Sequence, residues 1–111
     1  MEVNLKEQDG IKIAELKGDI DSKTATEAQE KMLPLVDQYK TMVLCMAGVG
    51  FMSSAGLRMM LLLYRHATAA NGKLALVGLS EQIKDTMAAT GFLRFFAVCG
   101  DVNEALTVLK K

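Results

Sequence analysis

The chain has 111 residues, half of them hydrophobic, which suits one globular domain over residues 1–111. Thirteen basic and thirteen acidic side chains give a formal net charge of zero, so electrostatics gives no reason to expect nucleic acid or an anionic membrane as partner. The polar start is unlike a signal peptide, and the longest apolar run, residues 59–64, is too short to cross a bilayer. We therefore expect a cytoplasmic protein that does not insert into a membrane.

Two runs of alternating apolar residues begin the chain, at residues 3–8 and 11–16. The Asp9-Gly10 pair between them is typical of a hairpin turn, so the runs predict two antiparallel strands. Residues 23–39 then have apolar side chains at helical spacing. Pro34 lies inside that helix and is expected to kink or split it.

The rest of the chain alternates predicted strands and helices. A continuous apolar run at residues 41–47 predicts a buried strand, and residues 54–70 predict a helix that Asn71-Gly72 ends, with Gly72 in the left-handed conformation. The later elements are a strand at 73–77, a helix from the Ser80 cap to about residue 90, a strand at 94–98, and a helix that Asp101 and Glu104 open and that runs to residue 109. The order β-β-α-β-α-β-α-β-α predicts an α/β domain with a mixed, mostly parallel sheet of about five strands and four or five helices.

Residues capable of catalysis or metal binding are few. His66, the single histidine, has no acid at helical spacing and is expected on a solvated helix surface. Asp19 and Asp21 suit a turn or a helix cap, or else an exposed docking rim. Cys45 and Cys99 lie in apolar runs and are expected as reduced, buried thiols. The sequence therefore predicts no enzyme, no cofactor and no metal site.

Two adjacent serines, Ser53 and Ser54, mark the start of the helix predicted at 54–70. One hydroxyl is enough to cap a helix, so the second is spare. A phosphate on the spare serine would lie near free N–H groups and the positive end of the helix dipole, which stabilise its charge. It would add about −1.5 to −2 charges to a neutral surface, a physical way to turn a docking face off.

The helix that follows is apolar nearly all round. Leu57, Met60, Leu61 and Tyr64 form one stripe, and further apolar residues lie outside it. One interpretation is a helix well buried in the domain. The other is that Met59 and Leu62, near Arg58 and His66, help to form a groove for a partner.

The stretch VLCMAGVGFMSSAGLRMM resembles the most specific motif of the STAS domain, the fold of bacterial anti-sigma-factor antagonists. The resemblance covers essentially the whole chain and includes GDIDSKTATE and NGKLALVGLSEQIKDTMAATGF. Within the central motif the matching residues are Gly48, Val49, Met52, Ser54, Ala55, Gly56 and Leu57.

The resemblance implies a partner switch in which Ser54 is phosphorylated by an anti-sigma factor that is also a serine kinase. The unphosphorylated antagonist binds that kinase and frees a sigma factor, and a serine/threonine phosphatase resets the switch. ATP and metal belong to those partners. We expect the partner-binding residues to be Gly18, Asp19, Asp21, Ser53, Ser54, Arg58 and Met59.

Two departures from the family pattern make the loop less negative. Ser53 replaces the usual Asp before the phosphorylated serine and is an alternative acceptor, and Cys45 replaces an Asp of the preceding strand. The alternative function is a STAS module without a switch, in a signalling scaffold or as an accessory subunit of a lipid transporter. The exposed edge of the first hairpin would also allow a weak homodimer.

Overall fold

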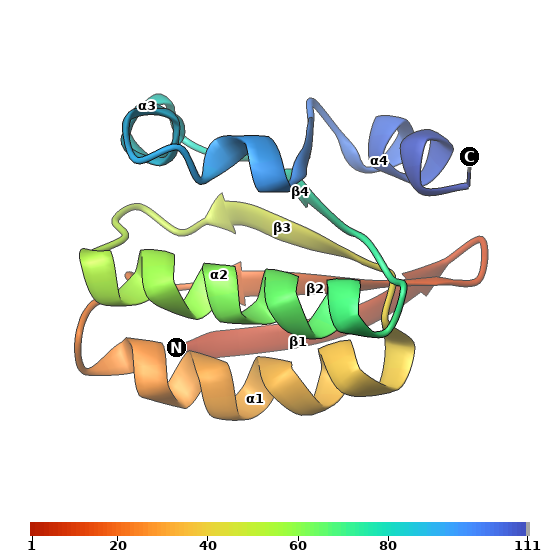
Figure 1. The fold of residues 1–111 in the computed structure, drawn as a ribbon, viewed down its shortest axis with the longest axis horizontal. Helices are drawn as coiled ribbons and strands as arrows, with labels where there is room; N and C mark the ends of the chain where they lie inside the picture. Colours follow the sequence, from red (N-terminus) through yellow and green to blue (C-terminus); the bar gives the residue numbers. More distant parts are fainter. Residues whose placement is uncertain (111) are drawn as a thin grey trace.

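The computed structural model describes residues 1–110, which form one five-stranded sheet and its helices (Figure 1). The strands are β1 (Glu2–Gln8), β2 (Ile11–Lys17), β3 (Met42–Gly48), β4 (Leu74–Val77) and β5 (Ala97–Cys99). The helices are α1 (Thr24–Tyr39), α2 (Ser54–Ala69), α3 (Glu81–Ala89), the short 3₁₀ helix η1 (Leu93–Phe95) and α4 (Val102–Leu109). The predicted α/β class and element order are confirmed.

The strands lie in the sheet in the order in which they occur in the chain, β1-β2-β3-β4-β5. β1 and β2 are antiparallel, and every later pair is parallel. The parallel strands β2 to β5 follow one another across the sheet, and each connection between them is expected to be right-handed. The connecting helices α1, α2 and α3 therefore all pack on the same face of the sheet. α4 covers a smaller core on the other face.

The hairpin turn between β1 and β2 follows the sequence prediction. Asp9 has a φ of 55° and Gly10 a φ of 79°, the paired positive angles of a type I′ turn. This turn sets the register that pairs Leu5 with Ala14.

One prediction about a helix break is partly wrong, and one about a helix end is wrong. Pro34 does not split α1, which is one continuous helix, and the alternative of a kink at Pro34 stays a prediction. Pro34 and Glu30 are both exposed, so the Glu30 carbonyl that loses its helical partner can bond to water. After α2 it is Asn71, with a φ of 62°, that takes the left-handed conformation rather than Gly72. Gly72 is needed for a different reason, because a Cβ there would overlap the Lys40 carbonyl.

The predicted fifth strand is also only partly right. The strand begins at Ala97, and Leu93–Phe95 turn as η1. That turn places Phe95 near Phe92, with ring centroids 6.5 Å apart, and against Tyr64 of α2 at 5.0 Å. Aromatic packing between elements therefore overrides the local strand propensity. Of the two free thiols, Cys99 is buried as expected, whereas Cys45 is only half-buried.

Candidate functional site

Two loops lie side by side at the carboxyl ends of β2 and β3, the edge where parallel sheets usually place their functional groups. The backbone N–H of Gly18 donates to the carbonyl of Gly48 at 3.0 Å, and the N–H of Ile20 donates to the carbonyl of Phe51 at 2.9 Å. In the opposite direction, the N–H of Ser53 donates to the carbonyl of Ile20 at 2.8 Å. These three bonds join the β2–α1 loop to the β3–α2 loop. We name their shared outer surface the docking ridge, formed by Gly18, Asp19, Asp21, Phe51, Ser53 and Ser54.

The two serines of the ridge have different surroundings. Ser53 is the N-cap of α2, with extended backbone, and its Oγ accepts a long hydrogen bond from the Gly56 N–H at 3.4 Å. Ser54 is the first helical residue and is exposed. Within residues 1–110 its hydroxyl takes part in no hydrogen bond. The spare serine beside the positive end of the helix dipole is therefore Ser54.

The two acidic residues of the ridge also differ. The Asp21 carboxylate accepts from the backbone N–H groups of Thr24 at 3.0 Å and Lys23 at 2.9 Å, which starts α1. These two hydrogen bonds hold the pKa of Asp21 below its usual value. Asp19 instead contributes its carbonyl, which accepts from the Thr24 hydroxyl at 2.7 Å, and its side chain is exposed. Asp21 thus has the cap role, and Asp19 leaves a carboxylate on the rim.

Phe51 is a ridge residue that sequence reasoning missed. Its side chain is 45% exposed, and the other large hydrophobic residue with such exposure among residues 1–110 is Leu5 in β1, at 41%. An isolated phenylalanine inside a glycine-rich loop, outside any apolar periodicity, was the available signal. An exposed aromatic ring beside polar groups is a typical anchor in protein interfaces.

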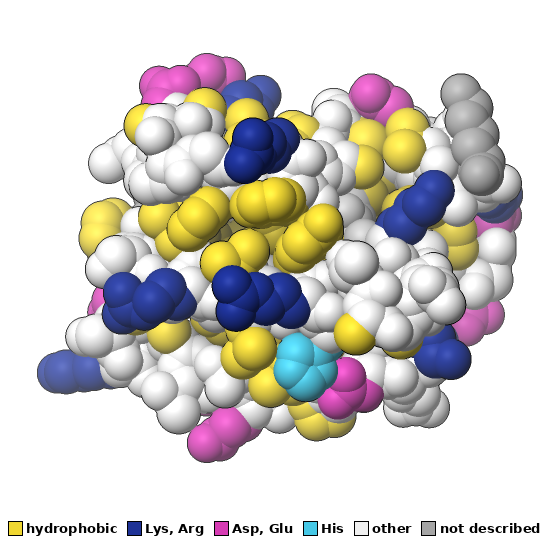
Figure 2. Space-filling view, in the orientation of Figure 1, with side chains coloured by type: hydrophobic (Ala, Val, Ile, Leu, Met, Phe, Trp, Pro, Cys, Tyr) yellow, Lys and Arg dark blue, Asp and Glu magenta, His cyan; other side chains and the backbone are white. Residues whose placement is uncertain are grey.

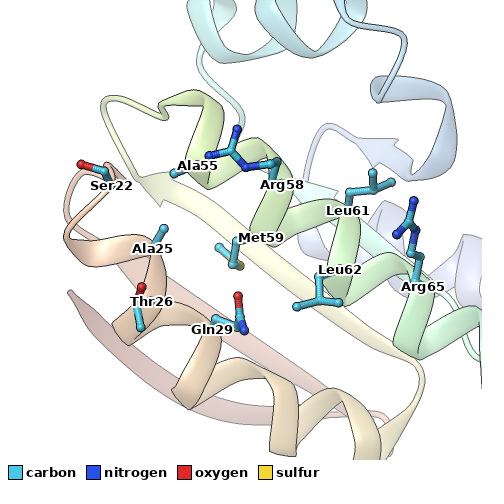
Figure 3. A pocket seen from close by; sticks show the side chains of 10 residues that line it. All are labelled: Ser22, Ala25, Thr26, Gln29, Ala55, Arg58, Met59, Leu61, Leu62 and Arg65. Carbon is cyan, nitrogen blue, oxygen red and sulfur yellow. The ribbon is translucent and has the colours of Figure 1, made fainter.

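A groove of about 620 Å³ runs between α1 and α2 and begins beside the ridge. In Figure 3, Met59 and Leu62 point from α2 toward α1, whereas Arg58, Leu61 and Arg65, which also line the groove, project from the opposite side of α2. Met59 is only 2% exposed, so it forms the floor of the groove and offers little surface to a partner. Met59 therefore belongs to the buried face of the helix, whereas binding of a partner in the groove stays a prediction.

His66 is half-exposed, as expected, but it does have an acidic partner. Its Nδ1 lies 2.8 Å from Oδ1 of Asp37, which α1 supplies and which helical spacing could not reveal. His66 is twelve residues from Ser54 on the same helix, about 18 Å along the axis, so His66 does not serve as a base for that serine. Within residues 1–110 we also find no group of three or more acidic, histidine or cysteine side chains placed to hold a metal ion.

Residues 2–105 match the model of the STAS domain family. The chain belongs to the STAS domain family. The match includes both loops of the ridge and ends within α4. Among the helices described for this STAS domain, none combines the length and apolar character needed to cross a membrane.

Named relatives of this STAS domain are anti-sigma factor antagonists. BtrV of Bordetella bronchiseptica carries the name anti-sigma factor antagonist. It is 29% identical over 111 residues, which cover 99% of this chain and 96% of BtrV. The anti-sigma-B factor antagonist of Bacillus subtilis is 28% identical over 89 residues, 80% of this chain and 82% of that protein.

Solved structures of anti-sigma factor antagonists share the fold of this STAS domain. An anti-sigma factor antagonist of Thermotoga maritima superposes with a TM-score of 0.91 at 17% identity, covering 98% of this chain and 95% of that one. The anti-sigma factor antagonist SpoIIAA in its unphosphorylated form superposes with a TM-score of 0.79 at 18% identity, covering 98% of this chain and 96% of that one. In its phosphorylated form the TM-score is 0.72 at 18% identity, and the coverage is 96% and 98%.

Proposed function

We propose that this STAS domain is an anti-sigma-factor antagonist, a binding protein that captures an anti-sigma factor and thereby releases a sigma factor. The names of its relatives and the shared fold support this proposal. Binding would use the docking ridge, where Phe51 supplies an apolar anchor and Asp19 a charged rim.

The switch would be phosphorylation of Ser54 by an anti-sigma factor that is also a serine kinase, with a serine/threonine phosphatase to reverse it. One observation carries this proposal: the two serines have different roles at the start of α2. Ser53 caps the helix, and the hydroxyl of Ser54 is left exposed. A phosphate there would leave the cap intact, so the fold would tolerate it.

The physical effect of the phosphate would fall on binding. It would add about −1.5 to −2 charges beside the carboxylates of Asp19 and Asp21, on a surface that a partner must desolvate. Arg58 lies one helical turn after Ser54, and in Figure 3 its side chain extends back toward Ala55 at the start of α2. Its guanidinium is therefore in position to pair with the phosphate, which would also withdraw Arg58 from a partner.

The test begins with recovery of the chain from its native cells and measurement of its intact mass. We expect a fraction one phosphate heavier, and we expect the co-purified kinase with ATP to add that phosphate to the purified chain. Ser54→Ala should abolish labelling, whereas Ser53→Ala should retain it. Labelling that survives Ser54→Ala would place the acceptor elsewhere, with Ser53 the first candidate.

The alternative of a permanent interaction module gives a different result. A chain that is always recovered unmodified, and whose partner binds Ser54→Asp as tightly as the unsubstituted protein, would be a module without a switch. The identity of that partner, a scaffold or a membrane transporter subunit, would then define its function.

A further inference from the structure

The three arginines of the chain lie on two neighbouring elements, α2 and η1. Arg58 and Arg65 project from α2 on the side away from α1 (Figure 3), and Arg94 belongs to η1. All three are exposed, and within residues 1–110 none of them forms an ion pair. Asp37 lies with Arg65 around a neighbouring hollow but pairs with His66, so the arginines leave this face with an excess of positive charge in a chain whose formal net charge is zero.

The same face holds four of the six aromatic residues of the chain, gathered where α2 meets η1. Tyr64 lies 5.0 Å from Phe95 and 5.7 Å, edge-on, from Phe96, and the Arg94 guanidinium lies 5.3 Å from the Phe95 ring. Tyr64 and Phe95 are only half-buried. In Figure 2 hydrophobic side chains fill the centre of this face, with Lys or Arg on both sides, and the acidic side chains lie farther out. We call this surface the α2–η1 seam.

The seam is also hollowed. A cavity of about 340 Å³ lies between the second half of α2 and β5, and Tyr64, Arg94 and Phe95 are among its lining residues. A hollow of this size accommodates one or two apolar side chains, and the arginines stand beside it. Arginine suits this arrangement because its planar guanidinium stacks on aromatic rings and still binds carboxylates.

We propose that the α2–η1 seam binds an acidic amphipathic helix of a partner protein. The apolar stripe of that helix would lie on Leu61, Tyr64 and Phe95, and its flanking carboxylates would pair with Arg65 and Arg94. A second copy of this chain does not fit, because a symmetric dimer through the seam would bring two positively charged surfaces together. The seam is distinct from the docking ridge, whose charged rim is acidic, and its binding does not require phosphorylation of Ser54.

The test is a ¹⁵N NMR titration of the full chain with a designed 18-residue helical peptide that has a leucine stripe flanked by glutamates. A matched peptide has lysines in place of the glutamates. We expect the acidic peptide to shift amide signals in residues 61–68 and 92–96, with a dissociation constant at least about tenfold lower than that of the lysine peptide.

Charge reversal at the seam provides the control. Arg65→Glu together with Arg94→Glu should invert the preference between the two peptides, whereas Lys84→Glu on α3 should leave it unchanged. The ¹⁵N spectrum of each variant alone verifies that it is folded. Equal affinity for both peptides, no binding of either, or shifts in the α1–α2 groove without any in residues 92–96 would overturn the proposal.

Discussion

The backbone N–H of Ser53 donates to the carbonyl of Ile20 at 2.8 Å, so the residue that caps α2 also holds the loop that precedes α1. The hydroxyl of the same residue accepts from Gly56. Ser53 thus fixes both the start of α2 and the spacing of the two loops. The hydroxyl of its neighbour Ser54 has no hydrogen-bond partner within residues 1–110.

The cap makes a prediction about stability. Ser53→Ala should lower the free energy of unfolding by about 1 kcal/mol, because the Gly56 N–H loses its acceptor. Ser53→Asp should stay within about 0.5 kcal/mol of the unsubstituted protein, since aspartate caps as well and suits the helix dipole. Urea unfolding measures both. Ser54→Ala is the control and should change stability by less than about 0.5 kcal/mol. A larger loss for Ser54→Ala than for Ser53→Ala would reverse the roles assigned to the serines.

Gly56 makes a second prediction, about the contact between the loops. A Cβ at Gly56 would lie 2.6 Å from Cγ of Met52 and 2.9 Å from Cγ2 of Ile20, both of them buried. Gly56→Ala should therefore push the loops apart and lower the free energy of unfolding by about 1–3 kcal/mol. Thermal and urea unfolding would show this loss.

Gly50 offers the matched control, in the same glycine-rich loop. A Cβ at Gly50 would meet only Oδ1 of Asp19, at an ordinary 3.4 Å. Gly50→Ala should leave stability nearly unchanged, and equal losses in the two variants would argue against the close approach at Gly56.

Phe51 is expected to contribute to binding and not to stability. Because its ring is 45% exposed, Phe51→Ala should change the free energy of unfolding by less than about 0.5 kcal/mol, yet it should weaken binding of the anti-sigma factor at least about tenfold. Calorimetric titration measures the affinity. Leu5→Ala removes a hydrophobic side chain of similar exposure, 41%, from the distant hairpin and should leave the affinity unchanged. An effect of Leu5→Ala as large as that of Phe51→Ala would mean that the partner does not bind at the ridge.

We expect the free energy of unfolding to depend on pH through Asp21. Its pKa is lowered in the folded protein by hydrogen bonds from the backbone N–H groups of Thr24 and Lys23. A carboxyl whose pKa falls on folding contributes stability above its unfolded pKa, and this contribution is lost as the pH drops through the folded value. The difference in stability between the unsubstituted protein and Asp21→Asn should therefore be largest near neutral pH and should shrink below about pH 4. Asp19→Asn removes the same charge from the same loop without touching those hydrogen bonds, so a matching pH profile for that variant would contradict the assignment.

Local signals in the sequence were sufficient for most of the fold. Asp9-Gly10, the Ser80 and Asp101 caps and the apolar run of β3 each act over a few neighbouring residues, and each is confirmed. The serine pair could also be read in advance, because capping is a local property of a helix start.

What the sequence could not reveal depends on contacts between distant segments. Asp37 reaches His66 across two helices, and Phe95 turns into η1 because Tyr64 lies opposite. Position 72 requires glycine because the backbone of Lys40 passes close by, and no pattern in the sequence around residue 72 indicates this contact. The same limit applies to the groove, whose floor residue Met59 was expected to face a partner.

The strand order has a consequence for how the chain folds during synthesis. Because each strand pairs with the one made just before it, the sheet can grow at one edge as residues leave the ribosome. The docking ridge and its helix cap need only the segments up to α2, so both loops can form before β4 exists. The helix that follows β5, α4, then covers Ile13, Val43 and Ala75, which would otherwise leave an apolar face on the nascent protein open to aggregation.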